Sequence, residues 1–326
     1  MSKQLPVPAE QRGSIRVGVS TCLLGQNVRY DGGHKLDHFL TDTLGRYVEY
    51  VPVCPEVECG LPVPREAMRL VGDVDAPRLV TIRSGVDHTD RMLSWARRRV
   101  RELETEELCG FIFKRGSPSS GMERVKVYSK TGMPSKTGVG LFAQTFMEHF
   151  PLLPVEEEGR LHDPKLRENF IERLFTLRHW REVLARGKSR RNLVAFHARS
   201  KLLLMAHSPK HLREMGRLVA QAATMESEVV FNQYQQLLLE ALSLKATPKK
   251  NANVLQHAMG YFKKVLSHDE KQELLDVIEQ YRLQLTPLIV PITLVSHYVR
   301  KYEEPYLAQQ TYLHPHPLEL QLRNHV

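Results

Sequence analysis

The stretch Ile15-Arg-Val-Gly-Val-Ser-Thr-Cys22 decides the expected fold of the first half of the chain. Its first six residues form a short β-branched run typical of a buried strand, and the run ends at a cysteine. Two later stretches have the same design. The stretch Tyr47–Val53 is followed by Cys54. The stretch Cys109–Phe113 leads into a loop of Gly, Ser and Pro over residues 116–121, which we name the serine loop. Three apolar strands that end in polar loops therefore organise this region.

Helical patterns separate these strands. Thr89–Leu108 carries apolar residues at helical spacing, and Gly138–His149 has the same character. Leu79–Ile82 and Val125–Tyr128 add two short strand candidates. Strands that alternate with helices predict an α/β domain with a mainly parallel sheet. Ligands of such sheets bind outside the carboxyl ends of the strands, where Cys22, Cys54 and the serine loop are expected to meet.

A change of pattern near residues 151–159 marks a domain boundary. Turn formers in Pro151–Pro154 and the acidic run 156–158 interrupt the apolar periodicity, and the chain beyond Asp163 is helical in pattern. Ser267 with Glu270 fits a capping box. We therefore predict a disordered lead-in at 1–13, an α/β domain at 14–152 and an all-α domain at 160–318.

The composition is that of a globular protein of the cytoplasm, with no apolar run long enough to span a membrane. All four cysteines lie in the first third of the chain, and a reducing compartment disfavours disulfides. Thiolates suit zinc or iron–sulfur clusters, but the paired knuckles of a structural zinc site are absent. Cysteine spacing alone leaves an iron–sulfur cluster and inert buried thiols as alternatives.

The net charge of +9 allows an anionic partner without requiring one. Most of the excess lies after residue 150, where Lys249-Lys250 and Lys263-Lys264 flank Tyr261 and Phe262. Such a cluster could contact nucleic acid through the basic helical domain, and a solvated helix face is the alternative. The sequence does not specify the oligomeric state.

Several separated motifs resemble known families. Residues 17–25 (VGVSTCLLG), 28–33 (VRYDGG), 52–61 (PVCPEVECGL) with Pro64-Arg65, and 110–121 (GFIFKRGSPSSG) resemble the DUF523 family. Residues 247–251 (TPKKN), 253–257 (NVLQH), 260–264 (GYFKK) and 287–292 (PLIVPI) resemble the DUF1722, or YbgA-like, domain. The first resemblance covers about residues 14–150, and the two domains are commonly fused.

Members of the first family include thiouracil desulfidases, which hold a [4Fe–4S] cluster by three cysteines. The resemblance implies Cys22 and Cys54 as cluster ligands, with Glu56 and Ser117 as catalytic acid–base or substrate-orienting groups. We expect Lys114 to neutralise the cluster or an anionic substrate, and Arg29 to orient the substrate or to pair with Asp31.

The sequence departs from the family at one position. The last family motif usually reads Ser-Pro-Ser-Cys-Gly, and Ser120 stands where its cysteine is expected. Serine is a poor substitute for a thiolate ligand, although its hydroxyl can contact substrate. Cys109 begins its strand, roughly 15 Å from the loop that follows the strand. Cys59 lies five residues after Cys54, so Cys22, Cys54 and Cys59 form our predicted ligand set.

The leading interpretation is an iron–sulfur-dependent desulfidase that removes sulfur from a thiolated pyrimidine or a related nucleobase-like substrate. Two alternatives remain. One is a protein that binds or modifies nucleic acid through its helical domain. The other is a degenerate cysteine domain without catalysis.

Overall fold

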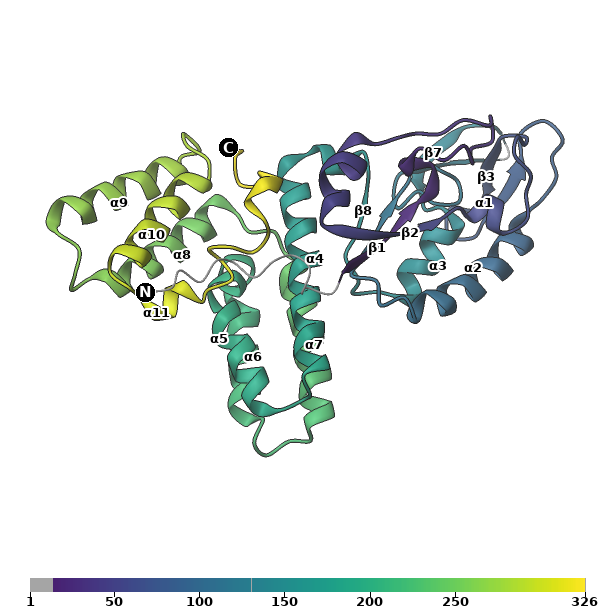
Figure 1. Cartoon of the computed structure of the whole chain (residues 1–326). Helices are drawn as coiled ribbons and strands as arrows, with labels where there is room; N and C mark the ends of the chain where they lie inside the picture. The colour runs from purple at the N-terminus through teal and green to yellow at the C-terminus, as the bar shows by residue number, and fades with distance from the viewer. Residues whose placement is uncertain (1–13, 130, 326) are drawn as a thin grey trace. The chain divides into compact units, whose positions relative to one another are not determined.

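The computed structural model describes residues 14–129 and 131–325, so the predicted lead-in at 1–13 lies outside the described residues. The chain divides into two compact units, and the boundary in the sequence falls between Arg160 and Leu161 (Figure 1). Within the described ranges, none of the helices has the length and apolarity needed to cross a membrane.

The first unit contains a four-stranded sheet that holds the three strands expected from the sequence. Its order is β2 (Val48–Val53), β1 (Ile15–Ser20), β5 (Gly110–Phe113) and β8 (Val155–Glu157). Each neighbouring pair is parallel. The prediction of an α/β domain with a mainly parallel sheet is therefore confirmed. The strand β8 lies beyond residue 152 and extends this sheet at its edge.

A second sheet has the order β4 (Pro77–Thr81), β3 (Met68–Gly72), β6 (Val125–Tyr128) and β7 (Pro134–Gly138). The β3–β6 pair is parallel, and the two outer pairs are antiparallel. The sequence analysis did not anticipate β3 or β7. Four of the five residues of β7 are exposed, so this strand lacks the apolar alternation by which a strand is recognised.

Two helices cover the core of the first unit, namely α2 (Thr89–Glu104) and α3 (Leu141–His149), which lie side by side in Figure 1. Phe111 and Phe113 of β5 pack with Phe142 and Phe146 of α3, at ring-centroid distances from 4.7 to 6.2 Å. Each such buried ring stabilises the fold by roughly 2–3 kcal/mol. Gly18 of β1 admits this packing, because a Cβ there would lie 2.2 Å from the ring of Phe111.

The second unit is helical, as predicted. Its helices are α4 (Pro164–Ala185), α5 (Arg190–His207), α6 (Pro209–Gln221), α7 (Ser227–Ser243), α8 (Pro248–Met259), α9 (His268–Arg282), α10 (Ile289–Lys301) and α11 (Pro305–Ala308). The capping box of Ser267 and Glu270 is confirmed at the start of α9. Trp180 is fully buried and stacks on Tyr234 at 5.0 Å.

Short helical segments complete the chain: α1 (Pro55–Glu58), the π-helix η3 (Phe39–Thr43), and the 3₁₀ turns η2 (Thr21–Leu24), η4 (Leu44–Arg46), η5 (Arg160–His162), η6 (Gly260–Phe262) and η7 (Leu318–Leu320). Of these, η2 and α1 begin where β1 and β2 end; η2 contains Cys22, and Cys54 directly precedes α1.

Candidate active site

The carboxyl ends of β2, β1 and β5 are adjacent because these three strands are parallel neighbours in the first sheet. The backbone N–H of Lys114, just after β5, donates to Ser20 Oγ at the end of β1 at 2.9 Å. The loops that follow the three strands therefore begin at one edge of the sheet, where α/β proteins bind ligands.

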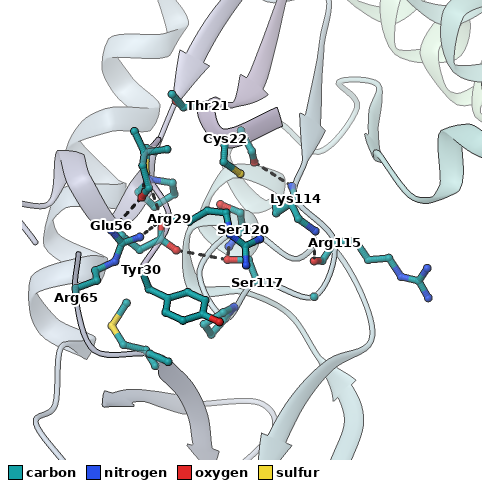
Figure 2. A pocket seen from close by; sticks show the side chains of 18 of the residues that line it. Thr21, Cys22, Arg29, Tyr30, Glu56, Arg65, Lys114, Arg115, Ser117 and Ser120 are labelled. Carbon is teal, nitrogen blue, oxygen red and sulfur yellow. Dashed lines mark hydrogen bonds and ion pairs between the residues drawn. The ribbon is translucent and has the colours of Figure 1, made fainter. Parts of the chain in front are cut away.

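A cavity of about 600 Å³ opens at this edge. Figure 2 shows side chains from all three loops gathered around it. Seven predicted site residues line the cavity: Cys22, Arg29, Cys54, Glu56, Lys114, Ser117 and Ser120. The other two predicted residues, Asp31 and Cys59, are not among its lining residues.

The two cavity cysteines are buried thiols. Cys22 lies in η2, and Cys54 precedes Pro55 at the start of α1. Burial, reinforced by the charge of Glu56, raises the pKa of Cys22 to about 11 and that of Cys54 to about 12. Both therefore carry their protons at neutral pH, and binding a metal would require each thiol to release its proton.

Glu56 occupies the centre of a polar network. Its Oε1 accepts a hydrogen bond from the Ser119 hydroxyl and faces Ser117 Oγ at 3.5 Å. Its Oε2 lies 3.8 Å from Arg65 Nη2 and 3.6 Å from Cys54 Sγ. The carboxylate thus contacts a cation, two hydroxyls and a thiol while it lines the cavity, which is a suitable arrangement for moving protons.

The serine loop is held by its own hydroxyl and by α3. Ser117 Oγ accepts the backbone N–H groups of Ser119 at 3.3 Å and Ser120 at 3.1 Å. The carbonyl of Ser119 accepts from the N–H groups of Phe142 at 2.9 Å and Ala143 at 3.1 Å, in the first turn of α3. Local sequence shapes this turn, and the packing of α3 fixes its position.

The two predicted cations, Lys114 and Arg29, lie at the cavity wall. Lys114 Nζ donates to Glu158 Oε1 at 2.6 Å and to the carbonyl of Arg115 at 2.8 Å. Arg29 Nε lies 3.4 Å from Asp31 Oδ1. Asp31 is exposed, and the N–H of Gly33, aided by Arg29, lowers the pKa of its carboxyl. Asp31 therefore does not line the cavity, but it contacts Arg29, which does.

Cys59 points away from the cavity. Its Sγ donates to the backbone carbonyl of Glu56 at 3.2 Å, and the residue belongs to the hydrophobic core beside α2. Arg91 Nε donates to the Cys59 carbonyl at 2.6 Å and anchors that turn. In residues 14–129 and 131–325, no three or more His, Cys, Asp or Glu side chains form a group able to hold a metal ion.

The side chains of the cavity do not match the three-cysteine ligand set of a [4Fe–4S] cluster. The cavity is lined by two residues with thiols, Cys22 and Cys54, and by Ser120 of the serine loop. A cluster held by three cysteine thiolates does not fit these side chains. An alcohol is a harder and less acidic ligand than a thiol, so Ser120 does not supply the missing thiolate.

The sequence analysis missed three residues of the site. Arg65 lies beyond β2 and reaches back to Glu56, Tyr30 lines the cavity beside Arg29, and the buried Ser119 bonds to Glu56. The Gly-Ser-Pro-Ser-Ser loop contained Ser119, but no local pattern distinguished it from its neighbours. Only the return of the chain over the cavity identifies Arg65.

Comparisons with known proteins agree with these motifs. The family model of 2-thiouracil desulfurase matches residues 17–158, and the model described as a protein of unknown function, DUF1722, matches residues 201–317. The protein YbgA of Escherichia coli strain K12 is 33% identical over 158 residues, which are 48% of this chain and 94% of YbgA.

A solved structure titled [4Fe–4S]-dependent thiouracil desulfidase TudS is 31% identical to this chain. The match covers 45% of this chain and 93% of TudS, with a TM-score of 0.38. The chain therefore belongs to the 2-thiouracil desulfurase (DUF523) family through residues 17–158 and carries a DUF1722 domain at residues 201–317.

Proposed function

We propose that this protein is a desulfidase-type enzyme that removes sulfur from a thiolated nucleobase-like substrate such as thiouracil. Membership of the 2-thiouracil desulfurase family supports the substrate class. The cavity of about 600 Å³ has room for a pyrimidine ring and a water molecule. Its wall combines acidic, basic, hydroxyl and thiol groups, which can hydrogen-bond to a polar ring.

The observation that carries the proposal is the environment of Glu56. A carboxylate that faces a substrate cavity and contacts Arg65, Ser117 and Ser119 is held in one orientation by several partners. Such positioning is what a general acid–base group needs. An exposed loop glutamate would lack these partners.

The reaction is a hydrolysis, and no atom changes its oxidation state. Water adds at the carbon of the C=S group, a C–O bond forms, the C–S bond breaks, and the products are C=O and hydrogen sulfide. Glu56 accepts a proton from the attacking water and passes it to the departing sulfur. The second proton moves from the new hydroxyl group to the sulfur as C=O forms, so that hydrogen sulfide leaves with both protons of the water. Ser117 donates a hydrogen bond to the substrate, while Arg29 and Lys114 stabilise negative charge that develops on it.

The cofactor part of the proposal concerns a [4Fe–4S] cluster: Cys22 and Cys54 are the two cavity thiols that would hold it, and it would supply a Lewis acid for the substrate sulfur, but the cavity lacks a third thiolate. Because the third cysteine of the predicted set lies off the cavity, no proton transfer described above depends on the cluster. Iron content is therefore measured separately from turnover.

The test is anaerobic incubation of the iron-reconstituted protein with 2-thiouracil, with sulfide and uracil measured together. Equal release of both products is expected. Glu56→Gln should lower the rate by about 10²–10⁴-fold, the range of general acid–base catalysis. Glu49→Gln is the matched control, because Glu49 lies at the opposite end of the same strand β2 and is exposed. Wild-type protein that binds thiouracil but releases no sulfide would favour the non-catalytic alternative.

A further inference from the structure

The acidic run 156–158 marks the domain boundary in the sequence, but its three side chains are buried. Glu156 is 7% exposed, Glu157 is 2% exposed and Glu158 is 9% exposed. Glutamate is among the residues that are least often buried, and a buried carboxylate is stable only where cations or N–H groups compensate its charge. The partners of these carboxylates therefore indicate what the run does.

The pairing of two strands places Glu158 beside Lys114. The parallel register of β5 and β8 matches Phe113 with Glu157, and the N–H of Glu158 donates to the carbonyl of Phe113 at 3.2 Å. Lys114 and Glu158 are the next residues along the two segments. Because matched residues of neighbouring strands direct their side chains to the same face, the ammonium and the carboxylate meet.

Glu158 holds the segment Lys114-Arg115 through both of its carboxylate oxygens. Its Oε1 accepts from Lys114 Nζ at 2.6 Å, and its Oε2 accepts the backbone N–H of Arg115 at 2.7 Å. Lys114 Nζ also donates to the carbonyl of Arg115 at 2.8 Å (Figure 2). The side chains of Lys114 and Glu158 are 17% and 11% exposed. The pair is therefore shielded from water, and the flexible lysine stem is fixed before a substrate enters the cavity.

Lys114 keeps one N–H donor for a ligand. An ammonium group has three N–H donors, and Glu158 and the Arg115 carbonyl use two of them. Among residues 14–129 and 131–325, no third acceptor contacts Lys114 Nζ. Lys114 lines the cavity, so its remaining donor is available to a molecule bound there.

Glu157 is equally buried but holds only backbone groups. Its Oε1 accepts the N–H of Met122 at 2.8 Å and the N–H of Glu123 at 3.4 Å. In the described part of the chain, none of these bonds reaches a side chain of the cavity. The two neighbouring glutamates therefore have different roles: Glu157 holds the backbone after the serine loop, and Glu158 also holds a cavity cation.

We propose that Glu158 is a positioning residue that orients the Lys114 ammonium for the reaction in the cavity. This inference rests on the proposed function, in which Lys114 stabilises negative charge on the substrate. Because that charge develops in the transition state, loss of the orientation should lower kcat and leave KM nearly unchanged. Glu158 itself does not line the cavity, so it acts through Lys114 and not on the substrate.

The kinetic experiment compares Glu158→Gln with the wild-type full chain, both iron-reconstituted, in the desulfidation of 2-thiouracil. Glutamine has the same shape, but its single carbonyl oxygen cannot replace both carboxylate oxygens. We expect kcat to fall about 10–100-fold, as for a displaced electrostatic group, and KM to stay within about twofold. Glu158→Asp keeps the charge and should restore part of the lost kcat. Glu157→Gln is the matched control and should keep the wild-type kcat and KM.

A double mutant separates positioning from a purely structural role. Lys114→Met removes the ammonium, so adding Glu158→Gln to it should cause no further loss of kcat if Glu158 acts only through Lys114. A further loss of the same size as in the wild-type background would overturn the proposal. Urea denaturation of each variant shows that the compared proteins are folded.

A measurement without turnover tests the contact itself. Acetic anhydride acetylates lysine amines, and peptide mass spectrometry gives the rate at each lysine. Glu158→Gln should accelerate the acetylation of Lys114 about tenfold, because a charge-assisted hydrogen bond is lost. Lys126, an exposed lysine of the same cavity, is the internal reference.

The two readouts distinguish this inference from the proposed function. Equal rates of Lys114 acetylation in wild type and Glu158→Gln would overturn the inference. Accelerated acetylation in a protein that releases no sulfide would support the contact between Glu158 and Lys114 and contradict the desulfidase function.

Discussion

Ser120 determines whether the cysteines at the cavity can bind an iron–sulfur cluster. It lines the cavity with Cys22 and Cys54, whereas Cys59 directs its sulfur to a backbone carbonyl in the core. Restoring a thiol at residue 120 would place three thiols on one cavity. Cluster binding should therefore respond to position 120 and be insensitive to position 59.

We expect Ser120→Cys to bind more iron than the wild-type protein after anaerobic reconstitution, approaching the four iron and four sulfide ions of one [4Fe–4S] cluster per chain. Cys59→Ser should retain the wild-type iron content, because this thiol lies off the cavity. The measurements are iron and sulfide analysis with the visible absorption spectrum. Loss of iron in Cys59→Ser would instead support the ligand set predicted from the sequence.

At the scale of elements, α3 sets the position of the serine loop. Gly140 caps this helix, and a Cβ at that residue would lie 2.5 Å from the backbone carbon of Ser119 and 2.8 Å from the nitrogen of Gly121. Both contacts are with backbone, which cannot move without displacing the loop. The site thus depends on a glycine that carries no functional group.

Gly140→Ala should destabilise the first unit by about 1–3 kcal/mol, the usual cost of forcing an extra carbon into a packed site. It should also weaken thiouracil binding, because Ser119 and its bond to Glu56 move with the loop. Gly260→Ala is the control, since no atom lies within 4 Å of the added carbon. Urea denaturation measures the first effect; equal stability of both variants would contradict it.

At the scale of the whole molecule, a buried charge cluster ties distant parts of the helical unit together. Glu172 of α4 accepts a hydrogen bond from His207 Nε2 at 2.9 Å and from Arg323 Nη2 at 2.9 Å. His207 Nδ1 lies 2.6 Å from the carbonyl of Leu244. Burial alone would raise the pKa of Glu172, but the hydrogen bond and charge of His207, with the charge of Arg323, lower it to about 2.

This cluster predicts an acid-sensitive stability. The pKa of Glu172 is lower in the folded chain than its ordinary value of 4.5, so its contribution is present above pH 4.5 and is lost as the pH falls towards about 2. Glu172→Gln should cost about 3 kcal/mol at pH 7, because it removes one of the two carboxylates that pair with the buried Arg323 and the carboxylate partner of His207. It should also flatten the acid limb of a stability–pH curve measured by urea denaturation.

The exposed pair of Glu279 and Arg282 in α9 provides the comparison. Glu279→Gln should leave the stability close to that of the wild type, because solvent screens surface ion pairs. A similar loss in both variants would show that the pairing of Glu172 is not special.

The sequence by itself determined the local elements and their order. The runs at 15–20, 48–53 and 110–113 are strands because β-branched and aromatic residues favour extended backbone, and the intervening apolar periodicity specifies α2 and α3. Parallel topology then follows from strand–helix alternation, and it places Cys22, Cys54 and the serine loop at one edge. Seven of the nine predicted site residues line the cavity for this reason.

Only the tertiary structure decided which side chains face the cavity and what adjoins it. The short helix α1 turns Cys59 into the core while Glu56 faces the cavity, a difference of direction that spacing along the chain does not reveal. Arg65 reaches Glu56 because the chain folds back, and β3, β6 and β7 come together because they pair in a second sheet. The pairing of strands distant in sequence, and the direction in which a helix turns each side chain, depend on the packing of the whole unit. The periodicity of the sequence reflects only interactions between residues close along the chain.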